Sequence, residues 1–220
     1  MQADPEQLEM LGKSPVPLLP YYLAKSCSKE FDSYDSCLKR YGNPLKCQDN
    51  GKKASSCFSG FWRNMGTDCA GTIGRDATDD KGQFKREFLN TFDNCLNTVS
   101  QKDNGSESYT ELVTPLENLP TDPNDLHMSC SSMGFMFSRR SCINKFESYK
   151  KCRKSSDAIG CSDQGRDLAL CTLNYTSGVV NRCIDNVSSF YTAQGGIDKS
   201  ASPPNNLDIL SQFYKCLSSN

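Results

Sequence analysis

The sequence is poor in the residues and motifs that mark enzymes and membrane-spanning proteins. Histidine occurs once, at His127, in a polar stretch without a nucleophile in any recognised motif, and no glycine-rich phosphate loop is present. The longest apolar run covers residues 133–137, far short of the roughly 18 residues that a membrane-spanning helix needs. We therefore expect no enzyme activity, no catalytic residues, no bound cofactor and no transmembrane segment.

An excess of charge is also missing. The chain has 26 acidic and 25 basic residues and a formal net charge of −1, which gives no long-range field to attract nucleic acid or an anionic membrane. Neither is therefore an expected direct partner. Residues 1–10 have neither a basic start followed by an apolar core nor an arginine-rich amphipathic pattern. This argues against a secretory signal peptide and against a cleaved matrix presequence.

Cysteine, in contrast, is abundant. Hydrophobic residues make up only 36% of the chain, yet 13 of its 220 residues are cysteines. From Cys27 the steps between successive cysteines are 10, 10, 10, 12 and 26 residues, and from Cys142 they are 10, 9, 10, 12 and 33. Nearly the same spacing thus occurs twice, with Cys130 outside both series.

Aromatic residues repeat together with the cysteines. The sequence Phe-Asp-Ser-Tyr at 31–34 returns 115 positions later as Phe-Glu-Ser-Tyr at 146–149. The pattern Leu-x-x-Phe-x-x-Cys-Leu at 89–96 returns 121 positions later at 210–217. Matching cysteines alone can reflect a shared redox constraint, but matching aromatics at fixed offsets from them indicate a duplication.

Apolar residues recur every three to four positions in both halves, which predicts an all-α fold. The predicted helices lie within 23–41, 47–65 and 84–99 in the first half and within 142–152, 168–190 and 207–217 in the second. We expect two tandem disulfide-stapled antiparallel helical hairpins, each with a third docked helix. The expected division is an extended proline-rich arm at 1–22, a first unit at 23–100, a polar linker at 101–129 and a second unit at 130–220.

The cysteine spacing also predicts the disulfide pairs. Ten residues along a helix rise about 15 Å, too far for two cysteines on one helix to bond each other, whereas an antiparallel neighbouring helix brings partners within reach. The cysteine twelve residues further along helix two then pairs with the cysteine on helix three. The predicted pairs are Cys27–Cys57, Cys37–Cys47, Cys69–Cys95, Cys142–Cys171, Cys152–Cys161 and Cys183–Cys216.

Other uses of the cysteines fit the spacing less well. Structural zinc favours a C-x2-4-C pair or histidine partners, and an active dithiol favours C-x-x-C, yet no two cysteines lie closer than Cys152 and Cys161. We therefore expect no metal site. Cys130 is left as a free thiol, which is either inert and buried or has a regulatory or intermolecular role.

Two segments upstream of the hairpins are candidate partner-docking elements. Three prolines within 15–20 argue against a regular helix there, so this segment is either a flexible tail or an extended strap along a partner. The run 133–137 is apolar on several sides, which fits either core packing or an exposed docking patch. The predicted docking residues are Pro15, Pro17, Pro20, Met133, Phe135, Met136 and Phe137.

The paired CX9C motifs resemble those of the CHCH (coiled-coil-helix–coiled-coil-helix) family. The resemblance implies a protein without a presequence that is oxidised on entry to the mitochondrial intermembrane space. It further implies transient docking to the import oxidoreductase through an apolar face beside one cysteine of each hairpin. The residues that match this face are Phe31, Tyr34 and Cys37 in the first copy and Phe146, Tyr149 and Cys152 in the second.

Within this family, the first five cysteines of the spacing and Phe92-x-x-Cys95 resemble the alpha-subcomplex subunit 8 group of respiratory complex I. The resemblance implies a non-catalytic accessory subunit, peripheral to the inner membrane, that contacts other subunits and carries no electrons. The alternatives are an accessory subunit of another inner-membrane complex, such as ATP synthase or cytochrome oxidase, or a soluble assembly factor.

Overall fold

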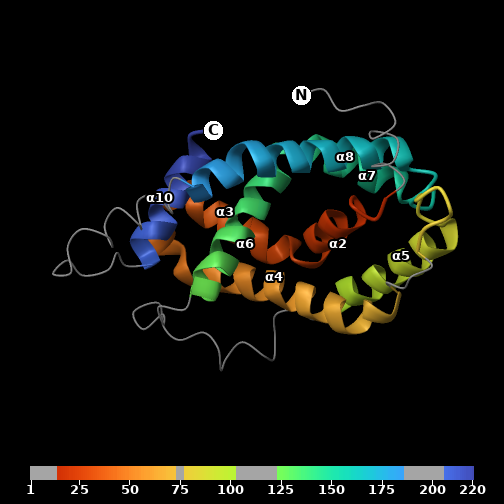
Figure 1. Cartoon of the computed structure of the whole chain (residues 1–220). Helices are drawn as coiled ribbons and strands as arrows, with labels where there is room; N and C mark the ends of the chain where they lie inside the picture. Colours follow the sequence, from red (N-terminus) through yellow and green to blue (C-terminus); the bar gives the residue numbers. More distant parts are fainter. Residues whose placement is uncertain (1–13, 73–76, 103–122, 186–205) are drawn as a thin grey trace. The chain divides into compact units, whose positions relative to one another are not determined.

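The computed structural model describes residues 14–72, 77–102, 123–185 and 206–220 (Figure 1). Helices account for the regular structure in these ranges, and the β contact found there is an isolated antiparallel bridge between Thr78 and Phe84. The predicted all-α fold is therefore confirmed. No described helix is long and apolar enough to cross a membrane.

The helices follow the duplicated sequence in order. The first copy contains α2 (Leu18–Ser26), α3 (Ser28–Tyr41), the short η1 (Pro44–Cys47), α4 (Gln48–Asp68), η2 (Ala70–Thr72) and α5 (Arg86–Gln101). The second contains α6 (Pro123–Ser141), α7 (Ile143–Cys152), α8 (Ser162–Tyr175), the π-helical η4 (Thr176–Val180), helical residues 181–185 and α10 (Asn206–Ser218). Thus α2–α3, α4 and α5 correspond to α6–α7, α8 and α10.

Local signals explain how the first hairpin turns. Gly42 follows α3 with φ at 61°, a conformation that glycine adopts without strain. Asn43 then accepts a hydrogen bond from the backbone N–H of Leu45 at 2.9 Å, and Pro44 occupies the first turn of η1, where no backbone donor is needed. Gly42 therefore ends the first helix of the hairpin, and Asn43-Pro44 begins the next helical segment.

The proline-rich segment differs from its prediction. Residues 18–22 are helical, because α2 begins at Leu18 with Pro17 as its N-cap and Pro20 in its first turn. The backbone nitrogens of a first turn have no intrahelical acceptor, so proline costs no hydrogen bond there. The prediction of an extended arm is therefore wrong for 18–22, and residues 1–13 lie outside the described part of the chain.

The linker between the two copies is also shorter than predicted. Helix α6 begins at Pro123, so residues 123–129 of the linker assigned to 101–129 are helical. Proline at the first helical position again explains why the proline content of this segment does not prevent a helix. Residues 103–122 lie outside the described residues.

The compact units of the structure do not coincide with the two copies in the sequence. Unit 1 comprises Met1–Ser28, Phe58–Asn104 and Arg139–Leu173, and unit 2 comprises Lys29–Cys57, Gly105–Ser138 and Asn174–Asn220. Each unit thus combines the hairpin turn of one copy with the outer helices of the other. The division into 23–100 and 130–220 describes the duplication but not the packing.

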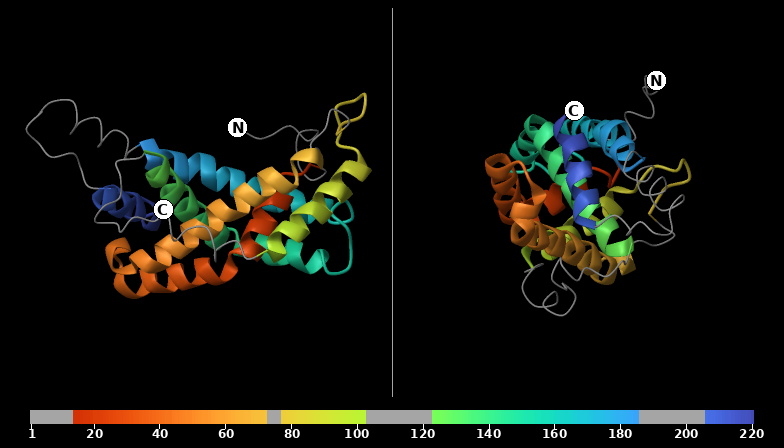
Figure 2. Two further views of the ribbon diagram at one scale, coloured as in Figure 1. Left: turned by 90° about the horizontal axis from the view of Figure 1, so that it is seen from below. Right: turned by 90° about the vertical axis from the view of Figure 1, so that its left-hand side faces the viewer.

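In unit 1, α2 lies beside α5, and the second hairpin packs against α2 (Figure 2). The rings of Tyr21 on α2 and Tyr149 on α7 meet edge to face with centroids 5.2 Å apart. Pro17 lies close to Gly165 on α8. The first copy therefore supplies the helices on which the hairpin of the second copy rests.

In unit 2 the roles of the copies are reversed. The ring of Phe31 on α3 contacts that of Phe135 on α6 with centroids 5.6 Å apart. The rings of Tyr214 on α10 and Phe137 on α6 meet with centroids 6.0 Å apart. Helix α10 also contacts η1 at the turn of the first hairpin. The hairpin of the first copy therefore rests on helices of the second.

Candidate functional site

The disulfides are the most distinctive chemical feature of the chain. Twelve of the thirteen cysteines are disulfide-bonded. The structure joins Cys37 to Cys47 and Cys152 to Cys161 near the hairpin turns, each with Cα atoms 5.8 Å apart, and it joins Cys142 to Cys171 at 5.9 Å. The third helices are attached by Cys69–Cys95 and Cys183–Cys216. These five pairs are among those that the spacing predicts, and Cys27 and Cys57 are each disulfide-bonded as well.

The aromatic residues predicted to dock to an import oxidoreductase lie in the interior. Phe31 and Tyr149 are at most 1% exposed, and Tyr34 and Phe146 are 6% and 5% exposed. Cys37 and Cys152 beside them are already in disulfides. This face is therefore closed in the folded, oxidised protein, so a carrier can use it only before the helices pack.

Two glycines allow the tyrosines of this face to pack closely. A Cβ on Gly51 of α4 would lie 3.1 Å from the ring of Tyr34, and a Cβ on Gly165 of α8 would lie 3.2 Å from the ring of Tyr149. The two contacts are equivalent in the two copies. Glycine in these helices therefore weakens local helix propensity in exchange for close contact between the helices of a hairpin.

The residues predicted to dock to a partner upstream of the hairpins are mostly buried. Pro17, Met133, Met136 and Phe137 lie in the interior, whereas Pro15, Pro20 and Phe135 are half-buried. The prediction that these residues form exposed docking elements is wrong, because both segments are the same element in the two copies: a helix preceding the hairpin that packs inside a unit. Leu18 and Met133, each 1% exposed, occupy equivalent positions in the two copies, four residues before Tyr22 and Phe137.

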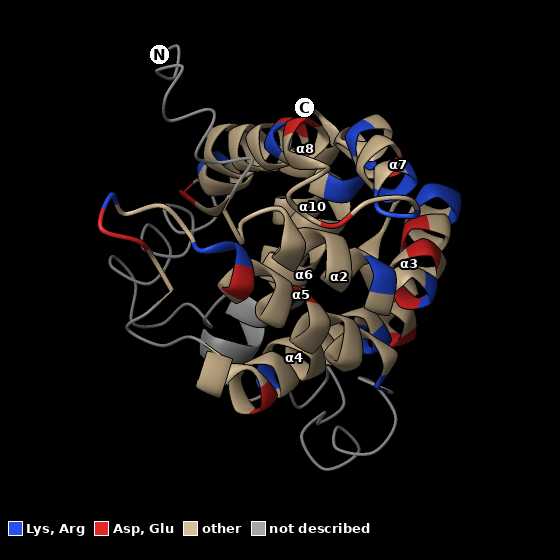
Figure 3. Ribbon diagram, turned by 90° about the vertical axis from the view of Figure 1, so that its right-hand side faces the viewer, with Lys and Arg blue, Asp and Glu red and all other residues tan. Residues whose placement is uncertain are grey.

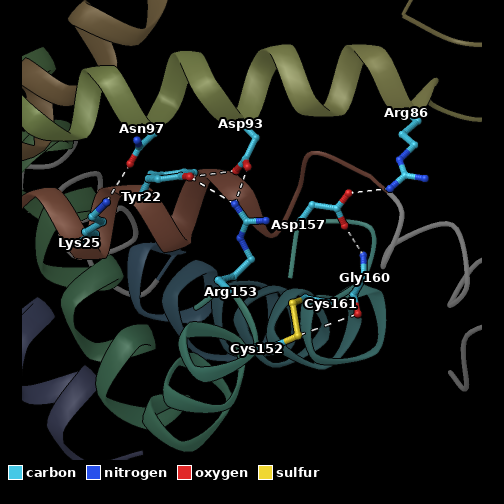
Figure 4. A network of polar contacts seen from close by, with 10 residues as sticks. All are labelled: Tyr22, Lys25, Arg86, Asp93, Asn97, Cys152, Arg153, Asp157, Gly160 and Cys161. Carbon is cyan, nitrogen blue, oxygen red and sulfur yellow. Dashed lines mark hydrogen bonds and ion pairs between the residues drawn. A yellow bond between two sulfur atoms is a disulfide. The ribbon is translucent and has the colours of Figure 1, made fainter. Parts of the chain in front are cut away.

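Unit 1 contains a buried charged network that the sequence analysis missed (Figure 4). The Tyr22 hydroxyl donates to one carboxylate oxygen of Asp93 at 2.9 Å, and Arg153 forms an ion pair with the other. The side chains of Arg153 and Asp93 are only 9% and 13% exposed. Burial and the negative charge of Asp93 raise the pKa of Tyr22. Burial alone would lower the pKa of Arg153, but the Asp93 carboxylate outweighs it and the pKa is raised.

Equivalent positions in unit 2 carry uncharged side chains. Position 22 corresponds to Phe137, position 93 to Tyr214 and position 153 to Leu38. These three also meet: Phe137 contacts the ring of Tyr214, whose hydroxyl donates to the backbone oxygen of Leu38 at 3.5 Å. The opposite charges of Asp93 and Arg153, both uncharged in the other copy, were the available sequence signal for this network.

A second polar contact in unit 1 holds the turn of the second hairpin. Asp157 accepts a hydrogen bond from the backbone N–H of Gly160 at 2.7 Å and pairs with Arg86 at 2.9 Å (Figure 4). The backbone hydrogen bond first, and Arg86 second, hold the pKa of Asp157 below its ordinary value. This contact attaches the turn of one copy to the start of α5 in the other.

Side chains that bind metal ions do not cluster in the described residues. These residues contain no group of three or more histidine, cysteine or acidic side chains that could hold a metal ion. Cys130, the free cysteine, is 7% exposed, and burial raises its pKa to about 12. Its thiol is therefore protonated and shielded in the native fold, which favours the inert interpretation over the regulatory one.

Compared with known proteins, the chain matches no protein-family model, no curated protein and no solved structure.

Proposed function

We propose that the protein is a non-catalytic structural subunit of respiratory complex I on its intermembrane-space side. The observation that carries the proposal is the repeated hairpin with a disulfide across its turn, formed by Cys37–Cys47 in one copy and Cys152–Cys161 in the other. Such disulfides persist in oxidising compartments and are rare in the cytosol. Together with the CHCH resemblance, they favour the intermembrane space.

The packing supports a scaffold role. Each unit is a set of helices fixed by disulfides and by aromatic contacts, and most large side chains of the described helices point into a core. A rigid body of this kind binds a partner without losing much conformational freedom, which is the advantage that a stabilising subunit provides. The assignment to complex I rests on the resemblance of the cysteine spacing to the subunit 8 group.

The burial of the aromatic residues predicted to dock to the import oxidoreductase is consistent with oxidation during import into the intermembrane space. Phe31 and Tyr34 are accessible to an oxidoreductase only while the first hairpin is unpacked, and the same holds for Phe146 and Tyr149 in the second. Oxidation then locks the hairpins and closes the face. Contact with the import oxidoreductase is therefore transient, and the lasting partners are subunits of the inner-membrane complex.

The test combines fractionation with a native gel. The protein should be released from mitochondria when the outer membrane is ruptured and should comigrate with complex I after mild detergent extraction. Depleting the protein should lower the amount of assembled complex I while leaving the other respiratory complexes unchanged. Comigration with ATP synthase or cytochrome oxidase would reassign the subunit, and migration only as a free small protein would overturn a subunit role in favour of an assembly factor.

A further inference from the structure

Basic residues are concentrated in one stretch of the second copy. Residues 139–154, here called the basic stretch, contain seven of the 25 basic residues of the chain but one of its 26 acidic residues, Glu147. The seven are Arg139, Arg140, Lys145, Lys150, Lys151, Arg153 and Lys154. The basic stretch therefore has a local charge of +6 (7 − 1), although the net charge of the whole chain is close to zero. A near-neutral net charge does not argue against an anionic partner at this stretch.

The corresponding stretch of the first copy shows that the fold does not require this charge. Residues 24–39 contain three basic and three acidic residues, a net charge of zero (3 − 3). Nevertheless α3 and α7 bury the same aromatic pair and lead into the same disulfide-bonded turn. A cation near the C-terminal end of a helix stabilises it, and the first copy already has such cations in Lys25 on α2 and Lys39 on α3. The additional charge of the second copy thus has no structural counterpart in the first.

Most of this charge is exposed. Arg153 is used internally on Asp93, whereas Arg140, Lys145, Lys150, Lys151 and Lys154 are exposed. Figure 3 shows the resulting basic colouring of α7. Two of the exposed lysines have acidic neighbours: Lys145 pairs with Asp167 at 2.7 Å and Lys150 with Glu147 at 3.1 Å. Both pairs are solvent-exposed and therefore weak, so they reduce the local field without removing it.

We propose that the basic stretch is a docking surface for anionic phospholipid headgroups. Protein–protein interfaces are depleted in lysine and enriched in arginine, whereas four of the five exposed basic residues here are lysines. Flexible ammonium groups suit diffuse attraction to a layer of phosphates, and clusters of four to eight basic residues bind anionic lipid surfaces. Ile143, 40% exposed at the start of α7, adds an apolar contact. This inference does not depend on membership of complex I.

The test uses the oxidised full-length protein and vesicles of phosphatidylcholine with or without phosphatidylglycerol. The protein should sediment with the anionic vesicles at low salt, not with the neutral ones, and high salt should release it. The variant Lys150→Asp with Lys151→Ser introduces the residues that the first copy has at positions 35 and 36. It should bind anionic vesicles at least roughly tenfold more weakly, because each basic residue near such a surface contributes appreciably.

The matched control is Lys52→Asp with Lys53→Ser on α4, which changes the net charge by the same amount elsewhere. It should keep the affinity of the unchanged protein, and circular dichroism should show that both variants are folded. Equal weakening by the two variants would overturn the proposal, because net charge and not the basic stretch would then control binding. Absence of binding to anionic vesicles would overturn it too. So would tighter binding of a polyglutamate peptide than of the vesicles, which would identify an acidic protein partner.

Discussion

Arg153 is the residue at which the two units differ most in chemistry. In unit 1 it lies buried on Asp93 beside Tyr22, while the equivalent place in unit 2 holds Leu38. The pairing in unit 1 is incomplete, because Nε and Nη1 of Arg153 have no hydrogen-bond partner among the described residues. Breaking a buried ion pair is costly, but replacing a whole imperfect pair by apolar groups often is not.

Changing Arg153 alone should therefore lower the free energy of unfolding far more than changing Tyr22, Asp93 and Arg153 together. Arg153→Leu leaves Asp93 buried without its cation, and we expect the free energy of unfolding to fall by about 3–5 kcal/mol. The triple change Tyr22→Phe, Asp93→Tyr and Arg153→Leu copies the residues of unit 2 and should restore most of that loss. Denaturant unfolding of the oxidised proteins measures both. A loss below about 1 kcal/mol for the single variant would show that the ion pair is not buried in solution.

The stability of the folded protein should depend on pH through Asp157. Its pKa is lower in the folded protein than its ordinary value near 3.9, so its stabilising effect is present above that value and is lost as the pH falls through the folded pKa. Asp157→Ala should cost about 1 kcal/mol at pH 7, because it removes both the hydrogen bond from Gly160 and the Arg86 pair. Asp157→Asn keeps an acceptor and should cost less.

The measurement is the free energy of unfolding of these two variants and the unchanged protein at pH 7 and at pH 2. The difference between Asp157→Asn and the unchanged protein should shrink at pH 2, which lies below the ordinary pKa of an aspartate, because the unfolded chain then binds a proton at this position. A difference that stays constant across this range would contradict an ionised Asp157 in the folded hairpin turn.

At the scale of helices, glycine provides a sharp comparison within α4. Alanine in place of a helical glycine usually stabilises, by up to about 1 kcal/mol, and a Cβ at Gly66 in the last turn of α4 would meet nothing within 4 Å. Gly66→Ala should therefore raise the free energy of unfolding. Gly51→Ala should raise it less or lower it, because its Cβ would lie 3.1 Å from Tyr34. Thermal unfolding of the two variants tests this, and equal stabilisation would refute the close helix contact.

The helices of the hairpins were predictable because the cysteine spacing fixes them independently of composition. Pro20 shows the limit of composition: three prolines within 15–20 argue against a regular helix, yet the first turn of a helix tolerates proline. The buried position of Met133–Phe137 was one of two interpretations, since an apolar run does not reveal what covers it. Comparison of Leu18 with Met133 and of Tyr22 with Phe137 across the copies would have identified one common helix.

At the scale of the whole chain, the exchange of hairpins between copies has no local sequence signal. Periodicity predicts which face of a helix is buried but not which copy supplies the partner. Two ion pairs drawn from different copies, Asp93 with Arg153 and Arg86 with Asp157, carry that information. The combination of α2 and α5 with the second hairpin in unit 1 was therefore beyond sequence reasoning.

This exchange predicts that neither copy folds by itself. Residues 1–102 and 123–220 each lack the hairpin or the outer helices that complete a unit. Produced separately, they should be largely unfolded or self-associated, whereas refolding them together under oxidising conditions should yield a defined heterodimer. Circular dichroism and sedimentation measure this outcome. Cooperative unfolding of either fragment as a monomer would show that each copy packs on its own outer helices.

The disulfides that lock the helical scaffold within each copy are tested most directly by peptide mapping of the unreduced protein from its own cells. Alkylation before and after denaturation should find one free thiol, Cys130, which is blocked only after unfolding because it is buried and its pKa is about 12. The cross-linked peptides should contain Cys37–Cys47, Cys69–Cys95, Cys142–Cys171, Cys152–Cys161 and Cys183–Cys216. Recovery of most cysteines as free thiols, or of a bond between Cys27 and Cys37, would contradict a scaffold locked by these disulfides.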